Sequence, residues 1–169
     1  MLSALLLAQA LHAGLSIGAG TAYDGAGVRI EAGTDHLTGF GGLGVLAFVN
    51  RSSASAPGGF GFSAGVRGYL GARGGLFFSL NLTDALFSNF ANYDLRILGV
   101  RRSVGSVRGR ETLPGSVSTL TAVIGWRWRF GAGFIELGAG AGGYRERQPG
   151  GKPSYGPIPD GVLGLGFDL

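Results

Sequence analysis

Large apolar residues alternate with small or polar residues along most of this chain, with a period of two that is typical of β-strands rather than helices. Between residues 120 and 130, for example, Trp126, Trp128 and Phe130 occupy one face of the expected strand, while Arg127 and Arg129 occupy the other. Such segments recur between glycine-rich turn signals. Regular spacing of this kind indicates an all-β sandwich or barrel.

The alternation predicts eight strands, near residues 14–23, 28–37, 42–50, 59–71, 76–83, 117–130, 134–146 and 161–169. An even number of strands permits a closed antiparallel up-and-down β-barrel with both termini at the same end. Short turns are then expected at that end, over residues 38–41, 72–75 and 131–133. The connections at the other end are a short one at 24–27 and longer ones at 51–58, 84–116 and 147–160.

The segment 84–116 is the longest of these connections. Its stretch DLRILGVRRSV, residues 94–104, could form an additional strand, and the apolar spacing from Leu86 to Ile97 also permits a short helix. A ninth strand would break the even count, so we assign this segment to one long outer loop.

The orientation of the strands follows from what each face carries. The faces opposite the large apolar residues hold mainly glycine, alanine and serine with few charges, which would make a poor water-exposed surface. The inverse arrangement places the large apolar face against lipid and the small and charged face inside, the dyad pattern of transmembrane β-barrels. A soluble ligand-binding barrel, with Trp126 and Trp128 inside, is the alternative.

The composition narrows the chemistry. The 169 residues contain no cysteine, which excludes disulfides and thiolate metal sites, and the formal net charge is +4. Of the 14 cationic residues all but Lys152 are arginines. They are spread singly, without a basic helix or an RNA-binding motif, so nucleic acid is not an expected partner.

The N-terminal stretch MLSALLLAQALHAG is similar to a secretory signal peptide. An apolar run precedes two small-residue cleavage patterns, so we expect a signal over residues 1–13, removed after Ala10 or Ala13, and a single barrel domain over residues 14–169. A short N-terminal helix is the other interpretation.

The chain ends with VLGLGFDL, which resembles the C-terminal strand of bacterial outer-membrane proteins. Its insertion-signal positions are Gly164, Phe167 and the terminal Leu169. Together with the signal-like N-terminus, this makes the chain similar to the small eight-stranded outer-membrane barrels of the OmpA/OmpX type. The resemblance implies the outer membrane of a Gram-negative bacterium, a lipid bilayer and lipopolysaccharide as surroundings, and insertion by the barrel-assembly machinery.

The resemblance also implies a girdle of aromatic side chains at each membrane interface. The expected members are Tyr23, Phe60, Phe62, Trp126, Trp128 and Phe130. Ordinary apolar packing is the alternative use of these side chains.

The interior of an eight-stranded barrel is just wide enough for side chains to fill. We expect a polar network there, formed by Arg29, Glu31, Arg67, Tyr69, Arg127, Arg129 and Glu136. Unpaired buried charges are costly, so Glu31 and Glu136 are each expected to meet an arginine. A narrow pore lined by these arginines is the alternative.

The sequence predicts no enzyme, because no catalytic dyad can be assembled from its two histidines. His12 lies near the expected cleavage site, and His36 is adjacent to Asp35 on the opposite face of a strand. The glycine-rich GFGGLG, residues 39–44, is not followed by a helix and is not a dinucleotide site. No metal or other cofactor is expected; a lipid-modifying enzyme is the alternative.

The outer connections carry a set of cations that could contact the phosphates of lipopolysaccharide or an acidic partner. These are Arg101, Arg102, Arg108, Arg110, Arg145, Arg147 and Lys152. The predicted function is therefore a structural or surface-interaction role for a monomeric outer-membrane barrel.

Overall fold

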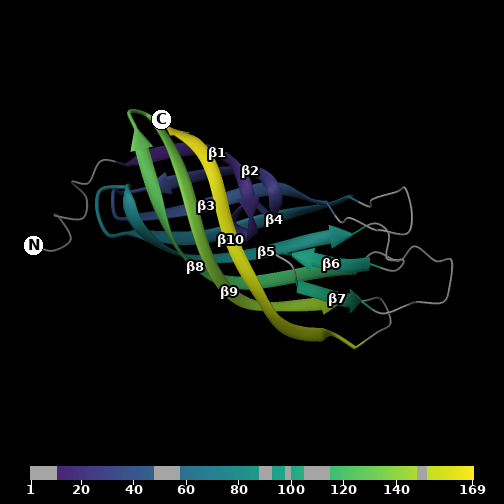
Figure 1. The fold of residues 1–169 in the computed structure, drawn as a ribbon. Helices are drawn as coiled ribbons and strands as arrows, with labels where there is room; N and C mark the ends of the chain where they lie inside the picture. The colour runs from purple at the N-terminus through teal and green to yellow at the C-terminus, as the bar shows by residue number, and fades with distance from the viewer. Residues whose placement is uncertain (1–10, 48–57, 88–92, 98–99, 105–114, 148–151) are drawn as a thin grey trace, which may run out of the picture.

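The chain forms a closed eight-stranded antiparallel β-barrel in which each strand pairs with its neighbours in an up-and-down order (Figure 1). The computed structural model describes residues 11–47, 58–87, 93–97, 100–104, 115–147 and 152–169. The predicted all-β class, the eight strands and the closed up-and-down topology are confirmed. Among the described residues, no helix is long and apolar enough to cross a membrane.

The barrel closes where the first strand pairs with the last, Leu15 lying opposite Phe167. In chain order the barrel strands are β1 (His12–Gly20), β2 (Gly25–Gly33), β3 (Leu37–Ala47), β4 (Gly58–Tyr69), β5 (Gly75–Phe87), β8 (Gly115–Phe130), β9 (Gly133–Arg147) and β10 (Ser154–Asp168). The expected signal lies mainly in residues 1–10, outside the described residues, whereas His12 and Ala13 already belong to β1.

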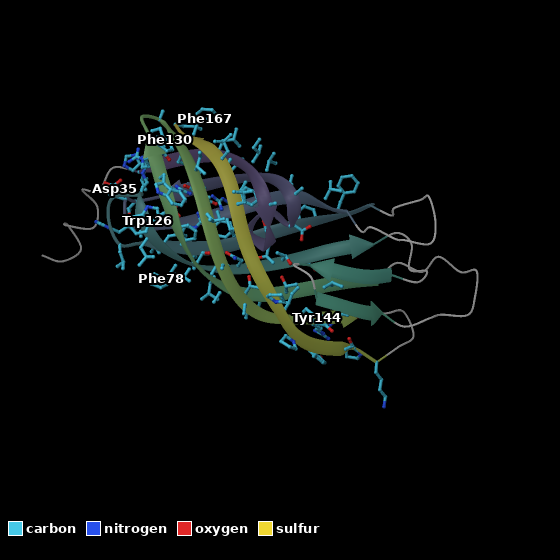
Figure 2. The ribbon with its side chains drawn as sticks, in the orientation of Figure 1. Asp35, Phe78, Trp126, Phe130, Tyr144 and Phe167 are labelled. Carbon is cyan, nitrogen blue, oxygen red and sulfur yellow. The ribbon has the colours of Figure 1, made fainter. Side chains whose placement is uncertain are left out.

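Side chains alternate strictly between the two sides of the wall. On β8, Ile124 and Trp126 are 49% and 47% exposed on the outer face, whereas the Arg127 side chain points inward and is 1% exposed. The outer face is covered by large apolar side chains all round the barrel (Figure 2). The barrel is therefore apolar outside and charged inside.

Three short turns connect strands at the end of the barrel where β1 begins and β10 ends, over residues 34–36, 70–74 and 131–132. The prediction of a turn at residues 38–41 is wrong, because these residues lie within β3. There Thr38 and Phe40 point inward while Gly39 and Gly41 lie on the outer face. The outward glycines suggested a turn, but they are paired in the sheet.

The connection between β1 and β2 folds into the barrel instead of forming an outer loop. Gly20, with φ +117, ends β1, and a short 3₁₀ helix η1 (Thr21–Tyr23) follows. Asp24, with φ 49, then reverses the chain into β2. The alternation had suggested that β1 continues to Tyr23, but the backbone leaves the sheet at Gly20 and carries this ring inside.

The long connection after β5 contains a separate hairpin of β6 (Tyr93–Ile97) and β7 (Val100–Val104), which is not part of the barrel sheet. The expected even number of barrel strands therefore holds, and the described part of this connection contains the two strands of the hairpin. β5 and β8 also extend further into this connection than the alternation suggested, to Phe87 and from Gly115.

The last strand, β10, begins at Ser154, well before the expected start at residue 161. Pro157 and Pro159 made the preceding segment resemble a loop. β10 pairs with β1 only from Leu163 onward, so one edge of this first part of the strand is open. Proline is tolerated on such an edge because its missing N–H leaves no partner unsatisfied.

Candidate functional site

Five charged side chains meet inside the barrel and form what we call the lumen cluster: Arg29, Glu31, Arg67, Arg127 and Glu136. They come from β2, β4, β8 and β9, and none is more than 3% exposed. All were expected inside from the alternation. The alternation did not indicate which of these arginines pairs with which glutamate, and the structure does.

Glu136 is the centre of the lumen cluster. One carboxylate oxygen, Oε1, lies 2.7 Å from Nη1 of Arg29, and the other, Oε2, lies 2.8 Å from Nη2 of Arg127 and accepts a hydrogen bond from Arg67. The Tyr23 hydroxyl donates to Oε1 over 3.1 Å. One carboxylate thus holds arginines from three different strands.

Glu31 forms the second half of the cluster. It accepts a two-pronged interaction from the guanidinium of Arg127, with Nη2 at 2.8 Å from Oε2, and a further hydrogen bond from Arg29 at 3.2 Å. Bidentate arginine–carboxylate pairs are among the stronger charge-assisted hydrogen bonds. Arg127 therefore bridges both glutamates and connects β8 to β2 and β9.

Aromatic rings cover the arginines of the cluster. The guanidinium carbon of Arg127 lies 3.8 Å from the centroid of the Phe134 ring, and that of Arg67 lies 4.0 Å from Phe77. Arg29 lies 4.7 Å from the Tyr23 ring. Cation–π contacts of this kind stabilise desolvated guanidinium groups.

Each of three inward phenylalanines lies directly opposite a glycine on the next strand. The cross-strand pairs are Phe40 with Gly65, Phe77 with Gly125, and Phe134 with Gly166. A Cβ on any of these glycines would come within 2.4–2.5 Å of the facing ring. The glycines thus leave the space that the rings occupy, a feature that alternation along a single strand could not reveal.

The other two residues expected in the lumen network differ in position. Tyr69 points into the interior and is 4% exposed. The centroid of its ring lies 5.0 Å from the guanidinium carbon of Arg127. Arg129 is instead at the mouth of the barrel, with a side chain 35% exposed, and pairs with Asp168 at 2.9 Å. It lies too near the end of β8 to reach the cluster.

A second ion-pair group closes this mouth. Arg73, in the turn between β4 and β5, is 6% exposed and reaches Asp35 at 3.4 Å and Asp168 at 3.3 Å. The Nε2 atom of His12 lies 3.1 Å from Asp35. Sequence reasoning missed Arg73, because a charged residue in a glycine-rich turn gives no sign that it folds back over the barrel.

Another polar group lies above the lumen cluster, where η1 enters the barrel. Asp160 accepts hydrogen bonds from the hydroxyls of Thr21 and Thr121 and from the amide nitrogen of Asn81 at 3.3 Å. The sequence analysis did not indicate Asp160, because it assigned residues 147–160 to an outer connection. These bonds hold η1 across the interior.

Asp24 follows η1, outside the strands, and is 2% exposed. Burial, together with the negative charge of Asp84, raises the pKa of the Asp24 carboxyl from 3.8 to about 6. Its Oδ2 atom has no hydrogen-bond partner. This carboxyl therefore changes charge in a range where an ordinary aspartate is already ionised.

The residues expected in the aromatic girdle divide into two groups. Five lie on the outer face with 45–75% of their surface exposed: Phe60, Phe62, Trp126, Trp128 and Phe130. Tyr23 is a correction, because η1 carries it inside, where it is 0% exposed against Gly18 and Gly164. Of the expected C-terminal signal, Gly164 faces this ring, while Phe167 and Leu169 are exposed on the outside.

The cations expected at the outer loops are only partly described. Arg145 and Arg147 lie on β9 and Lys152 precedes β10, the last two exposed. Arg101 and Arg102 lie in β7. Arg108 and Arg110 lie outside the described residues.

Comparisons with protein-family models, with curated proteins and with solved structures returned no match. The fold and the interior define the class on their own: the chain is an eight-stranded up-and-down β-barrel whose charged residues are paired inside and whose outer face is apolar.

Proposed function

We propose that this protein is an integral outer-membrane β-barrel with a filled lumen and a structural or surface-interaction role. The observation that carries the proposal is the inverted distribution of side chains. Arg29 and Arg67 are 0% exposed inside, whereas Phe60 is 75% exposed outside. Such an outer surface is unfavourable in water and favourable in hydrocarbon, where a closed barrel satisfies its backbone internally.

The height of the apolar surface supports a bilayer. On β8 the outward residues are apolar from Leu120 to Phe130, and the next outward residue above Leu120 is Ser118. A rise of about 3.3 Å per residue and a strand tilt of about 40° give this band a height of about 25 Å, the height of the apolar band of outer-membrane barrels.

The register supports one polar boundary for this band. Leu82 and Leu120 lie opposite each other, and one step further Asp84 lies opposite Ser118, which lies opposite Arg145. The apolar surface therefore ends at the same level on β5, β8 and β9, as the edge of a bilayer requires. Phe60 and Phe62 lie near this level on β4, and Trp128 and Phe130 lie at the opposite end.

The asymmetry of the two ends supports an orientation. The short turns and the end of β10 lie together with the start of β1, while the hairpin of β6 and β7 lies at the other end of the barrel (Figure 1). In outer-membrane barrels short turns face the periplasm. We therefore place the termini there, with export through the N-terminal signal and insertion by the barrel-assembly machinery, as for the OmpA/OmpX type.

The lumen cluster supports a filled interior rather than an open pore. Each of its arginines is paired with a carboxylate, and three of the rings around them lie against glycines of the wall. The interior groups hold one another, so we assign them to the stability of a monomeric barrel and not to catalysis. The outer connections are then the part that meets lipopolysaccharide or an acidic partner.

Folding in detergent micelles and in lipid vesicles tests the proposal. The purified chain should run faster on a gel when unboiled than when boiled, and only after folding with detergent or lipid. Lipids brominated on their acyl chains should quench Trp126 and Trp128, because both rings lie on the outer face at 45–47% exposure. The Trp126→Phe and Trp128→Phe variants separate the two signals.

Cooperative folding in plain buffer, with tryptophans that brominated lipid does not quench, would contradict the proposal. That result would favour a water-soluble barrel.

A further inference from the structure

A hollow of about 550 Å³ lies on the outer face of the barrel, at the loop end of the apolar band. It crosses β5, β8, β9 and β10. Its lower side is formed by Leu82 and Leu120, and Gly143 lies opposite Leu120 in the adjoining strand. One step up the register, Ser118 and Tyr155 lie on either side of Arg145. The hollow is therefore apolar below and cationic above.

Arg145 differs from the arginines of the lumen cluster because no described carboxylate pairs with it. It is half-buried between its neighbours, and its Nε atom is buried without a hydrogen-bond acceptor. The Nε atoms of Arg29 and Arg67 also have no acceptor, but each of those guanidinium groups pairs with Glu136. A buried donor without an acceptor is costly and uncommon in native proteins. An anion in this hollow would satisfy it by charge-assisted hydrogen bonding.

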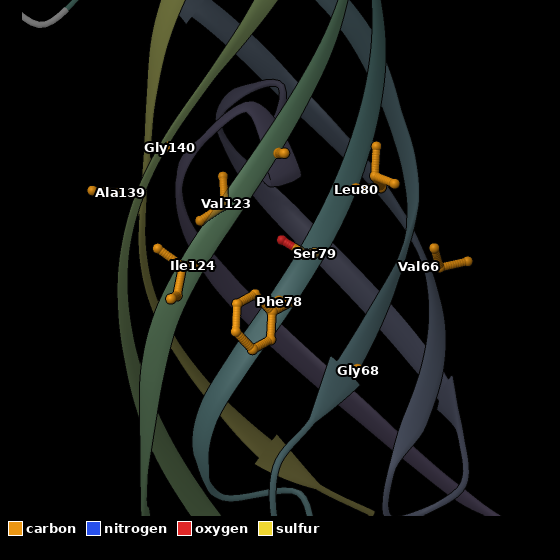
Figure 3. A pocket seen from close by; sticks show the side chains of 10 residues that line it. Val66, Gly68, Phe78, Ser79, Leu80, Val123, Ile124, Ala139 and Gly140 are labelled. Carbon is orange, nitrogen blue, oxygen red and sulfur yellow. The ribbon is translucent and has the colours of Figure 1, made fainter.

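A second hollow of about 460 Å³ follows on the same outer face, deeper in the apolar band (Figure 3). Small residues, Ala122 and Ala139, lie between the larger side chains of Phe78, Leu80 and Ile124. Both hollows are lined by β5, β8 and β9. An acyl chain that runs from the first hollow past Gly143 would therefore enter the second one, where Ala122 and Ala139 leave room for it.

We propose that this face binds one molecule of lipopolysaccharide through the lipid A part, with a lipid A phosphate on Arg145 and an acyl chain over Gly143 toward Ala122 and Ala139. The proposal rests on the proposed function, which places Arg145 at the outer leaflet. Charge complementarity selects the phosphate, and the apolar floor selects the chain. Tyr155, 64% exposed, then lies at the boundary between headgroup and hydrocarbon.

The test is lipid binding by the folded full-length protein in a neutral detergent, measured by native mass spectrometry with added bisphosphorylated lipid A. The wild-type protein should retain one lipid A molecule. Loss of a charge-assisted hydrogen bond in Arg145→Gln should weaken binding about tenfold. Arg129→Gln, which removes a cation at the opposite mouth, should bind as the wild type does.

The floor of the hollow gives a second, independent variant. A Cβ at Gly143 would meet one described atom within 4 Å, the backbone oxygen of Gly156 at 3.7 Å, so Gly143→Leu starts its side chain in open space and directs it into the hollow. This variant should also weaken lipid A binding several-fold. Gly39→Leu, on the outer face of β3 with nothing within 4 Å of the new Cβ, is the matched control.

Removing the lipid's phosphates should lower the affinity of the wild type to that of Arg145→Gln. The inference is overturned if both Arg145→Gln and Gly143→Leu bind lipid A as the wild type does, or if phosphatidylglycerol binds as tightly as lipid A. Those results would not contradict the proposed outer-membrane barrel, provided that the chain folds in detergent. Failure to fold there, with folding in plain buffer, overturns both.

Discussion

Arg127 and Arg145 lie on neighbouring strands but on opposite sides of the barrel wall, and their partners differ. Arg127 holds Glu31 and Glu136 and lies against the ring of Phe134. Arg145 has only Ser118 and Tyr155 as cross-strand neighbours. Inside, where water is excluded, a guanidinium must be paired within the protein. At the outer rim a guanidinium can instead remain available to an anionic ligand, as we propose for Arg145.

Glycine shows the same difference between the two sides. A side chain on Gly125 would collide with the ring of Phe77, at 2.4 Å from its Cζ atom, whereas one on Gly39 would meet nothing within 4 Å. The interior glycine is needed for packing, and the exterior one is not. The facing ring therefore restricts the residue at position 125 inside the barrel, whereas no described atom restricts the residue at position 39 on the outer face.

The largest expected effect breaks the pairing inside. Glu136→Gln leaves three buried arginines with one carboxylate, and should lower the free energy of unfolding by about 3–5 kcal/mol. Urea unfolding in lipid vesicles, followed by tryptophan fluorescence, measures it.

Asp84→Asn is the control for this variant, because Asp84 is exposed, accepts a hydrogen bond from Ser118 and pairs with none of the arginines of the lumen cluster. Equal stability of the two variants would show that the lumen cluster does not hold the barrel together.

A smaller effect compares the glycines directly. Gly125→Val forces Phe77 out of its place and should cost about 1–3 kcal/mol, as overpacking in cores does. Gly39→Val should change the stability by less than about 0.5 kcal/mol, as is usual for surface sites. The same unfolding measurement serves both, and a larger loss in Gly39→Val would reverse the comparison.

The last prediction concerns the pH dependence of stability at the loop end of the interior. Folding raises the pKa of Asp24 to about 6 from 3.8, so between these values the native state binds a proton that the unfolded chain has released. Stability from this group is therefore present below about pH 4 and is lost as the pH rises through about 6.

Asp24→Asn should remove this part of the pH dependence. It is measured as the difference between wild type and variant in the free energy of unfolding, taken at pH 4.5 and at pH 7.5. A difference that does not change between the two pH values would mean that Asp24 titrates normally.

The alternation of residues was sufficient to predict the eight barrel strands and the inward, charged faces of β2, β4, β8 and β9. A period of two is a local property, and the even count and the contrast between the two faces follow from it. The inward positions of Arg29, Arg67 and Glu136 were predictable for the same reason. Strand ends were less so: outward glycines in β3 and prolines in β10 resembled loops, because pairing with a neighbour is not visible in a single strand.

Other features depended on the tertiary structure, because they join residues distant in sequence. Tyr23 lies inside because Gly20 turns the backbone inward and Gly18 and Gly164, from opposite ends of the chain, leave space for its ring. Glu136 meets three arginines only when barrel closure brings the inner faces of β2, β4 and β8 near that of β9. The sequence by itself determined a closed barrel with charge inside. The register between strands decided which charges pair, and it placed Arg145 where none of the described carboxylates reaches it.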